Sequence, residues 1–381
     1  MALLAMPVEL VGSIVSYLEP RDVGALRTTC KHARSLCHKA FQTNLNRRRT
    51  TYCWETLERL QDTFSSQYSE EIHTLNLTLP NPPSRSISSL LPLAGMLVAS
   101  ESDLQRFGCL AALLASTFTS AARLRRLTIE ASPGSETFTS RHTVPFSILR
   151  PTTASSSSTV GFDLGRCFTS VISAIVASRT LLEELSVWVS AEPPASNIPR
   201  AGLPLAALEV PSIAAVRLTE SLDRLERLQL TVEAFAEDVY LTRRAALQLL
   251  PGFVAHARHL RILMLAFRYS HAWKTNQEDF FDAFANGVDL PMLQTFVLSH
   301  AYVSAHALST FFLRQERLQC VTFYRTILLR EHWSRVTDGL GLRKLNVDHC
   351  WEAWSRSHSF LQSPHFCKLC SLKGFVVLEE D

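Results

Sequence analysis

The chain has 381 residues, of which 46% are hydrophobic and 19% are charged, and its formal net charge is +3 at pH 7. This composition is typical of a folded chain with a large core or a repeat array, and it excludes a disordered protein. The small net charge argues against strong unspecific binding to nucleic acid or to an anionic membrane, so we expect neither as a partner.

Nine cysteines are scattered at irregular spacing, which indicates reduced thiols inside a cell and not a disulfide framework. No apolar run approaches the ~18 residues of a membrane span. A secretory signal peptide is rejected because Glu9 interrupts the first apolar segment and no basic residue precedes it. We therefore expect a cytoplasmic or nuclear protein.

Residues 6–34 predict two short helices. Pro7 suits a first helical turn, and Asp22 can cap the second helix. Apolar residues recur on one face of the first helix at Leu10, Ile14, Tyr17 and Leu18. The second helix is expected to carry Val23, Leu26, Cys30, Ala33 and Leu36 on one face. Two helices this short cannot bury both faces, so either the rest of the chain or another protein must cover them.

This spaced set resembles the F-box, the helical module that docks a chain onto the Skp adaptor of a Skp–cullin–F-box ubiquitin ligase. Met6 and Val23 stand where the family has leucine, and both are apolar. The residues that carry the resemblance are Met6-Pro7, Glu9-Leu10, Ile14, Leu18, Asp22-Val23, Leu26, Cys30-Lys31 and Arg34. The resemblance implies that the Skp adaptor is contacted, or the contact directly supported, by Met6, Pro7, Leu10, Ile14, Leu18, Val23, Leu26 and Cys30. From the residues alone, an ordinary helical hairpin stays open as the alternative.

Three arginines at 47–49 follow the F-box-like stretch. They can contact phosphate, but cations also suit the negative end of a helix dipole, and we expect them to end a helix and face water. Residues 51–64 predict a further helix with one apolar side formed by Trp54, Leu57, Leu60 and Phe64. We therefore assign 1–45 to the F-box, 46–70 to a helical linker and 71–381 to a target-binding domain.

A short pattern recurs through the predicted target-binding domain: apolar, two others, apolar, one other, apolar. Its copies begin at Ile72, Leu124, Leu182, Leu225, Leu260, Leu293, Leu318, Leu342 and Leu372. The last two apolar residues of each copy alternate as in a strand with one buried face. Helix-like runs lie between copies, at 104–118, 167–177, 242–256, 278–284 and 305–313. The sequence therefore predicts an α/β fold in which a solenoid has parallel strands on one side and helices on the other.

The repeated stretch resembles degenerate leucine-rich repeats. Most copies lack the asparagine or cysteine that usually follows the strand, and only Cys350 fits it. Segments 133–160 and 192–211 are rich in serine or proline and predict exposed insertions, which a solenoid tolerates on one face. Unrelated α/β strands are the alternative that the short pattern leaves open.

Strand residues between the buried positions should line the concave face of such a solenoid. Tryptophan, tyrosine and arginine are common anchors of protein interfaces, although any of these residues can also merely solvate the sheet. The candidates for contact with a target protein are Glu184, Trp188, Arg227, Gln229, Met264, Thr322, Tyr324, Asn346 and Asp348.

One cysteine pair has the spacing of a metal site. Cys367 and Cys370 could bind zinc together with His349 or Cys350, but a second clear pair is missing. Buried thiols explain the two cysteines better, since cysteine is often buried. We therefore expect no metal and no cofactor.

No catalytic signature is present: the sequence has no phosphate-binding loop, dinucleotide fingerprint, nucleophile elbow or zinc-protease helix. We therefore expect no enzyme activity. Together the two resemblances imply a substrate-recognition adaptor that binds the Skp adaptor, and through it a cullin ligase, and holds an unknown target protein. The alternatives are an interaction scaffold that is not coupled to ubiquitination and an enzyme whose site is dispersed.

Overall fold

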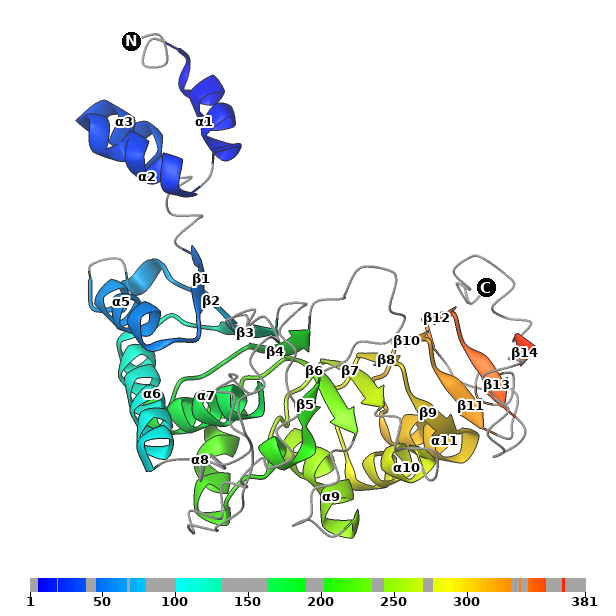
Figure 1. Ribbon diagram of the computed structural model, residues 1–381. Coiled ribbons are helices and arrows are strands. Elements are labelled where there is room, and N and C mark those ends of the chain that lie inside the picture. Colours follow the sequence, from blue (N-terminus) through cyan, green and yellow to red (C-terminus); the bar gives the residue numbers. More distant parts are fainter. Residues whose placement is uncertain are drawn as a thin grey trace, which may run out of the picture.

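The structure is a computed structural model in which the described residues are 6–18, 20–38, 46–66, 69–79, 101–131, 164–189, 202–234, 243–269, 277–329, 333, 336, 342–353 and 365–366. These residues form a group of short N-terminal helices followed by a long mixed α/β array (Figure 1). The ninth copy of the repeated pattern, the segment 133–160 and the pair Cys367 and Cys370 lie outside the described residues.

Among the described residues, the N-terminal group includes the helices α1 (Val8–Ser16), α2 (Pro20–Thr29) and α3 (Lys31–Leu36). The expectation of one second helix that includes Cys30 is wrong. Cys30 has an extended backbone, with φ −163° and ψ 167°, and its sulfur accepts a hydrogen bond from the Ala33 N–H at 3.3 Å. Cys30 thus separates two helices and caps the later one.

The three helices enclose a small core of their own. Its buried members are Val11, Val15, Val23 and Cys37. Burial raises the pKa of the Cys37 thiol, with the nearby Arg27 acting in the opposite direction, so this thiol behaves as an apolar group. The core is separate from the one that runs through the α/β array.

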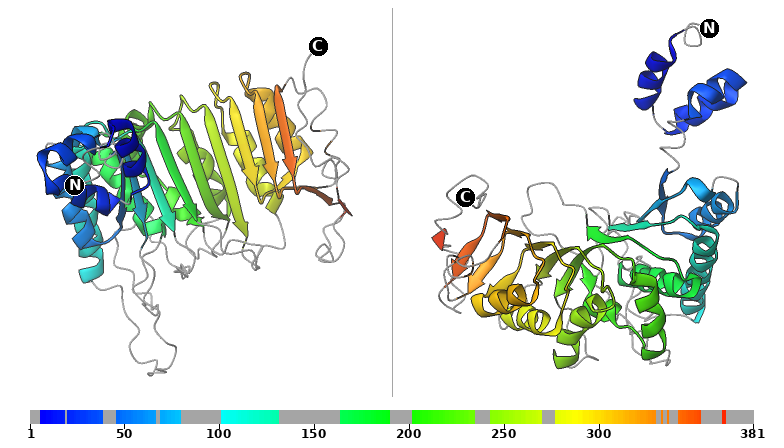
Figure 2. Two further views of the ribbon diagram at one scale, coloured as in Figure 1. Left: turned by 90° about the horizontal axis from the view of Figure 1, so that it is seen from above. Right: turned by 180° about the vertical axis from the view of Figure 1, so that it is seen from behind.

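A ten-stranded parallel sheet runs through the array (Figure 2). Its strands, in spatial order, are β1 (Arg47–Thr51), β2 (Thr74–Thr78), β3 (Arg126–Ala131), β4 (Glu184–Val189), β6 (Arg227–Ala234), β7 (Ile262–Tyr269), β8 (Thr295–Ser299), β10 (Cys320–Tyr324) and β12 (Lys344–Asp348), with the short β5 (Leu203–Pro204) paired to β6.

The recurring apolar residues are in register along this sheet. Successive Cα partners are Leu75, Leu127, Leu185, Leu228, Leu263, Phe296, Val321 and Leu345, and all are buried. Each copy supplies the same buried position, so each strand needs its neighbours to complete the core. The predicted α/β solenoid with parallel strands is confirmed.

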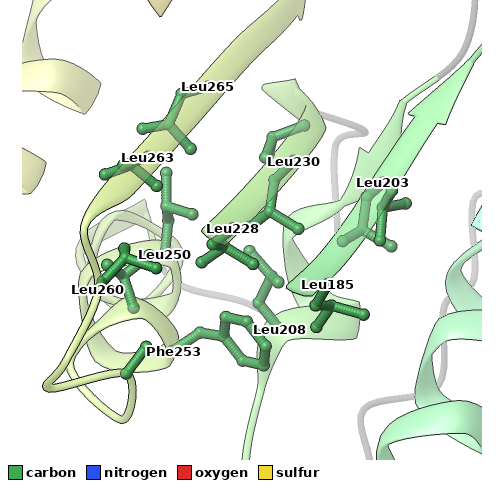
Figure 3. Close-up of a cluster of buried hydrophobic side chains, with 14 of the residues drawn as sticks. Leu185, Leu203, Leu208, Leu228, Leu230, Leu250, Phe253, Leu260, Leu263 and Leu265 are labelled. Atoms are coloured by element: carbon green, nitrogen blue, oxygen red, sulfur yellow. The ribbon is translucent and has the colours of Figure 1, made fainter. Parts of the chain in front are cut away.

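Helices cover one face of the sheet (Figure 2). They are α5 (Trp54–Phe64), α6 (Glu101–Ser120), α7 (Leu164–Ser178), α8 (Ser212–Leu222), α9 (Arg243–Val254), α10 (Gln277–Gly287) and α11 (Ala305–Arg314). The described residues also include two short 3₁₀ turns, η2 (Ser69–Glu71) between α5 and β2 and η3 (Leu205–Leu208) between β5 and α8. Figure 3 shows leucines of β4, β6 and β7 gathered around Leu250 and Phe253 of α9. One continuous core thus joins the strands to the helices.

A second, smaller sheet is formed by short strands, three of which follow β8, β10 and β12 along the chain. It consists of β9 (Tyr302–Ser304), β11 (Ile327–Leu329) and β13 (Trp351–Ala353), which are parallel, and β14 (His365–Phe366), which is antiparallel to β13.

The structure differs from the sequence-based expectations at the start and in the middle of the array. The arginines at 47–49 directly follow the helical residue Asn46, as expected, but they also form β1, which pairs with β2, so the sheet begins before residue 71. Residues 202–211 are packed and not an exposed insertion. Leu203 pairs with Val232 of β6, and Leu203 and Leu208 are buried. The rest of the segment 192–211 lies outside the described residues.

Candidate functional site

The outer face of α1 is apolar and exposed. Leu10 and Ile14 are 51% and 37% exposed, and Tyr17, just beyond the helix, is 87% exposed. Met6, just before the helix, is 36% exposed. We call these four residues the outer strip of α1. Because Leu10, Ile14 and Tyr17 follow one another at three- or four-residue intervals, they lie along one side of the helix, and Met6 precedes it.

The inner face of the same helix is buried in the small core. Val11 and Val15, each one residue after a member of the outer strip, are 1% exposed in the core with Val23 and Cys37. A helix of a small module therefore has two apolar faces, and only one is covered within the part of the chain that the structure describes. A contiguous apolar strip of this kind marks a surface for another molecule.

The structure gives the predicted adaptor-binding residues three different positions. Those with exposed side chains are Met6, Pro7, Leu10, Ile14 and Cys30. Leu18 and Leu26 are half-buried against the small core, and Val23 is fully buried in it. Val23 therefore supports the module and offers no surface. Tyr17 was not among the predicted contact residues, although its place three residues after Ile14 could have indicated it.

The open face of the sheet, opposite the helices, carries the nine predicted target-binding residues. Backbone alternation places them there, because the residues between them point toward the helices. Register brings Glu184 beside Arg227 and Tyr324 beside Asp348. These two pairs stay apart, since β7 and β8 lie between them.

The half of this face near the N-terminus is charged. Glu184 Oε2 lies 3.2 Å from Arg227 Nη1 and 3.7 Å from Arg126 Nε, so one carboxylate serves two guanidinium groups. Arg49 Nη2 reaches Glu130 Oε2 at 3.2 Å across β2. The ion pairs are partly exposed, so each contributes little to stability, but together they fix the polar character of this half.

The other half is more apolar and ends in a ring cluster. Met264 is the register partner of Val297, which pairs with Thr322. Three residues surround Tyr324, namely His300, Arg325 and His349. The repeat pattern singles out none of them, and the sequence indicates His349 only as a possible zinc ligand. Each comes two residues after the last apolar position of its repeat, so aligning the last repeats could have found them.

Neither a metal site nor a membrane helix occurs in the described part of the chain. There, no three histidine, cysteine, aspartate or glutamate side chains are grouped so that they could hold a metal ion. The described helices include none that combines the length and hydropathy of a membrane span.

The family comparison identifies the N-terminal helices. Residues 3–40 match the family model described as the F-box domain. These residues are an F-box domain. The match includes all of α1, α2 and α3, and with them the whole outer strip. F-box domains in general bind the Skp adaptor, and the proteins that carry them are typically non-catalytic adaptors. The F-box domain therefore gives this chain a role in protein interaction.

The other comparisons add little. The search among curated proteins returned no match. Among solved structures, a protein from Bacteroides fragilis with a known crystal structure is similar, with a TM-score of 0.36 and 11% sequence identity. The similarity covers 79% of this chain and 73% of that protein. A likeness at this level carries no argument about function.

Proposed function

We propose that this protein is a substrate-recognition adaptor of a Skp–cullin–F-box ubiquitin ligase. Its F-box binds the Skp adaptor, and its solenoid binds a target protein. The observation that carries the proposal is the outer strip of α1, which is exposed apolar surface within an F-box domain. The cytoplasm or the nucleus is the location that fits this role.

The outer strip can supply the binding energy for such a contact. Burying a leucine or isoleucine side chain completely contributes about 1.5–3 kcal/mol. Leu10 and Ile14 are only partly buried within the chain, so a partner groove would complete their burial. Docking of one apolar helix face into a groove is a common mode of recognition, with anchors at three- and four-residue spacing.

The mechanism needs no reacting group on this chain. By holding a target protein near a ubiquitin-charged enzyme, the adaptor raises the effective concentration of the target's lysines. The solenoid suits this task because its stacked repeats present one long, continuous face. We propose that the target lies on the open face of the sheet, where Trp188, Arg227 and Tyr324 are the best interface anchors by residue type.

Co-purification with the Skp adaptor tests the first half of the proposal. Wild type should bind, and the variant with Leu10→Asp and Ile14→Asp should not, because two carboxylates would have to be buried. Leu313→Asp is the matched control. Leu313 is 81% exposed on α11, so this variant should bind as wild type does. Equal binding by all three proteins, or by none, would contradict the proposal.

Ubiquitin transfer tests the second half. In cells, proteins that co-purify with the solenoid should carry less ubiquitin when the Leu10→Asp and Ile14→Asp variant replaces wild type. Unchanged ubiquitination, combined with lost adaptor binding, would show that the protein is an interaction scaffold that does not feed a ligase.

A further inference from the structure

Three successive strands of the sheet, β8, β10 and β12, end in the same unusual backbone conformation. Within two residues of the last apolar position come His300, Arg325 and His349, with φ of 54°, 48° and 51°. The His300 N–H donates to the Tyr324 carbonyl, and the Arg325 N–H donates to the Asp348 carbonyl, both at 2.9 Å. The first bond links the end of β8 to the end of β10, and the second links the end of β10 to the end of β12.

This conformation is left-handed and favours glycine. A residue with a Cβ atom costs roughly 1–2 kcal/mol there, although asparagine, aspartate and histidine are found in this conformation more often than other residues. Among the three positions, the fold alone would therefore favour glycine most strongly at Arg325. Non-glycine residues held in this conformation cluster at functional sites, so the Arg325 side chain points to a role other than folding.

All three side chains gather around one ring, that of Tyr324. The His300 ring centroid lies 5.6 Å from the Tyr324 centroid, and the His349 centroid lies 6.0 Å from it. The Arg325 guanidinium carbon is 5.2 Å from the same centroid. We call these four residues the Tyr324 cluster. It brings a guanidinium, two imidazoles and a phenol to one corner of the open face.

Apolar surface adjoins the cluster on the same face. Tyr324 follows Thr322 by two residues on β10, and the register partner of Thr322 on β8 is Val297, itself paired with Met264 of β7. Met264 and Val297 are half-buried and lie on the side of the sheet that no described helix covers. The Tyr324 cluster and this apolar pair therefore lie on the same face of the sheet, with Thr322 and Ser299 next to Tyr324.

We propose that the Tyr324 cluster binds a glutamate or aspartate side chain of the target protein, while an apolar side chain next to that residue packs on Met264 and Val297. The inference rests on the proposed function, because it assigns the chemistry of the target to the open face. It makes the preferred target segment an acidic residue beside an apolar one.

Charge balance favours a carboxylate over a phosphate. Asp348 lies against the cluster, and its carboxylate is hydrogen-bonded to His349 Nδ1. A carboxylate brings one negative charge to Arg325, whereas a phosphate dianion would bring a second one close to the Asp348 carboxylate, so the carboxylate fits better.

Peptide binding to the full-length protein tests the proposal. The probes are pools of short fluorescent peptides with a fixed central pair, in which leucine follows glutamate, glutamine, phosphoserine or lysine. Fluorescence anisotropy should show the tightest binding for the glutamate pool. Arg325→Gly should weaken that binding by about tenfold or more, since a charge-assisted hydrogen bond is lost, and should remove the preference for glutamate over glutamine.

A stability measurement separates a binding role from a structural one. Arg325→Gly relieves the left-handed backbone, so its melting temperature should equal or exceed that of wild type. Arg325→Lys keeps the charge and should keep part of the preference for glutamate. Arg317→Ala removes an exposed arginine from the turn before β10 and should leave both binding and the preference unchanged.

Several results would overturn the inference. These are equal binding of the glutamate and glutamine pools, tighter binding of the phosphoserine or lysine pool, binding of no pool, or an unchanged preference in Arg325→Gly. Co-purification with the Skp adaptor distinguishes a failure of the Tyr324 cluster to bind a carboxylate from a failure of the F-box to bind the adaptor. Arg325→Gly should still bind the Skp adaptor, and a chain that bound no adaptor could still prefer the glutamate pool.

Discussion

The solenoid and the F-box domain use similar apolar patterns with different results. In the solenoid, apolar residues at repeat spacing are buried by the next repeat, as Phe296 is between β7 and β10. In α1, Val11 is buried whereas its neighbour Leu10 is 51% exposed. A module of three short helices has too little material to cover every apolar face. Periodicity thus finds apolar faces, and the size of the surrounding module decides which of them become interfaces.

The largest effect should follow from a cavity in the solenoid core. Phe296→Ala should lower the free energy of unfolding by about 3–5 kcal/mol, because a fully buried ring is lost. In wild type, the ring centroid of Phe296 lies 4.8 Å from that of Phe311 and 6.4 Å from that of Phe281. Urea denaturation measures the loss, and Leu313→Ala on the exposed face of α11 should change it little. Under native conditions Phe296→Ala should still bind the Skp adaptor; lost binding would mean that the two regions are not independent.

A smaller loss is expected where β5 meets β6. A Cβ atom added at Gly202 would lie 2.7 Å from the Glu233 nitrogen and 2.9 Å from the Val232 carbonyl carbon. Both are backbone atoms of β6, which is held in the sheet, so Gly202→Ala should cost about 2–3 kcal/mol in urea denaturation. Gly108→Ala in α6 is the control, because apart from its own chain neighbours and helix backbone no atom lies within 4 Å of its added Cβ. Equal stability of the two variants would mean that residues 202–211 are not packed as described.

The small core of the F-box helices and the outer strip of α1 should respond differently to truncation. Val23→Ala in α2 removes two methyl groups from the small core that also holds Val11, so it should destabilise the F-box helices by about 1.5 kcal/mol. Leu10→Ala should hardly change that stability but should weaken adaptor binding directly. Amide hydrogen exchange of residues 6–38 measures the first effect, and a binding titration measures the second. The same response from both variants would remove the distinction between the small core and the outer strip.

The smallest effect concerns pH and belongs to the solenoid. Burial, and then the neighbouring Arg258, lower the pKa of His256 from its ordinary value of 6.5. The Nδ1 atom of His256 also lies 2.7 Å from the Thr219 hydroxyl. The His256 imidazole therefore takes up a proton at higher pH in the unfolded chain than in the folded chain. Its contribution to the free energy of unfolding is fully present above about pH 6.5 and is lost as the pH falls through the lowered pKa of the folded state.

Melting temperatures check this pH effect. When the pH is lowered from about 7.5 to about 5.5, the melting temperature of wild type should fall by more than that of His256→Gln, because the variant has no imidazole at position 256 to protonate. An identical pH dependence of the two proteins would show that His256 contributes none of it.

The sequence predicts those parts of the fold that depend on apolar spacing. Leu293, Phe296 and Leu298 mark β8, and the same spacing marks the other described repeats, because burial against helices demands it. Leu10 and Ile14 follow the same logic for α1. Whether these residues contact the Skp adaptor is not tested by the structure and stays a prediction.

Features set by neighbours could not be predicted in this way. Arg47, Arg48 and Arg49 show no apolar alternation, yet they form β1 because β2 offers a free edge. The break at Cys30 comes from a backbone conformation and a sulfur hydrogen bond that leave no mark in periodicity. The left-handed residues beside Tyr324 likewise belong to backbone geometry, and only the alignment of repeats would have shown that they recur.

Hydrogen exchange of the full-length protein with and without the Skp adaptor tests the central claim most directly. If the outer strip of α1 is the surface that another subunit covers, adding the adaptor should slow exchange in Val8–Ser16 and leave β6 to β10 unchanged. Exchange in α1 that stays as fast as in the free protein, or protection confined to the solenoid, would contradict it.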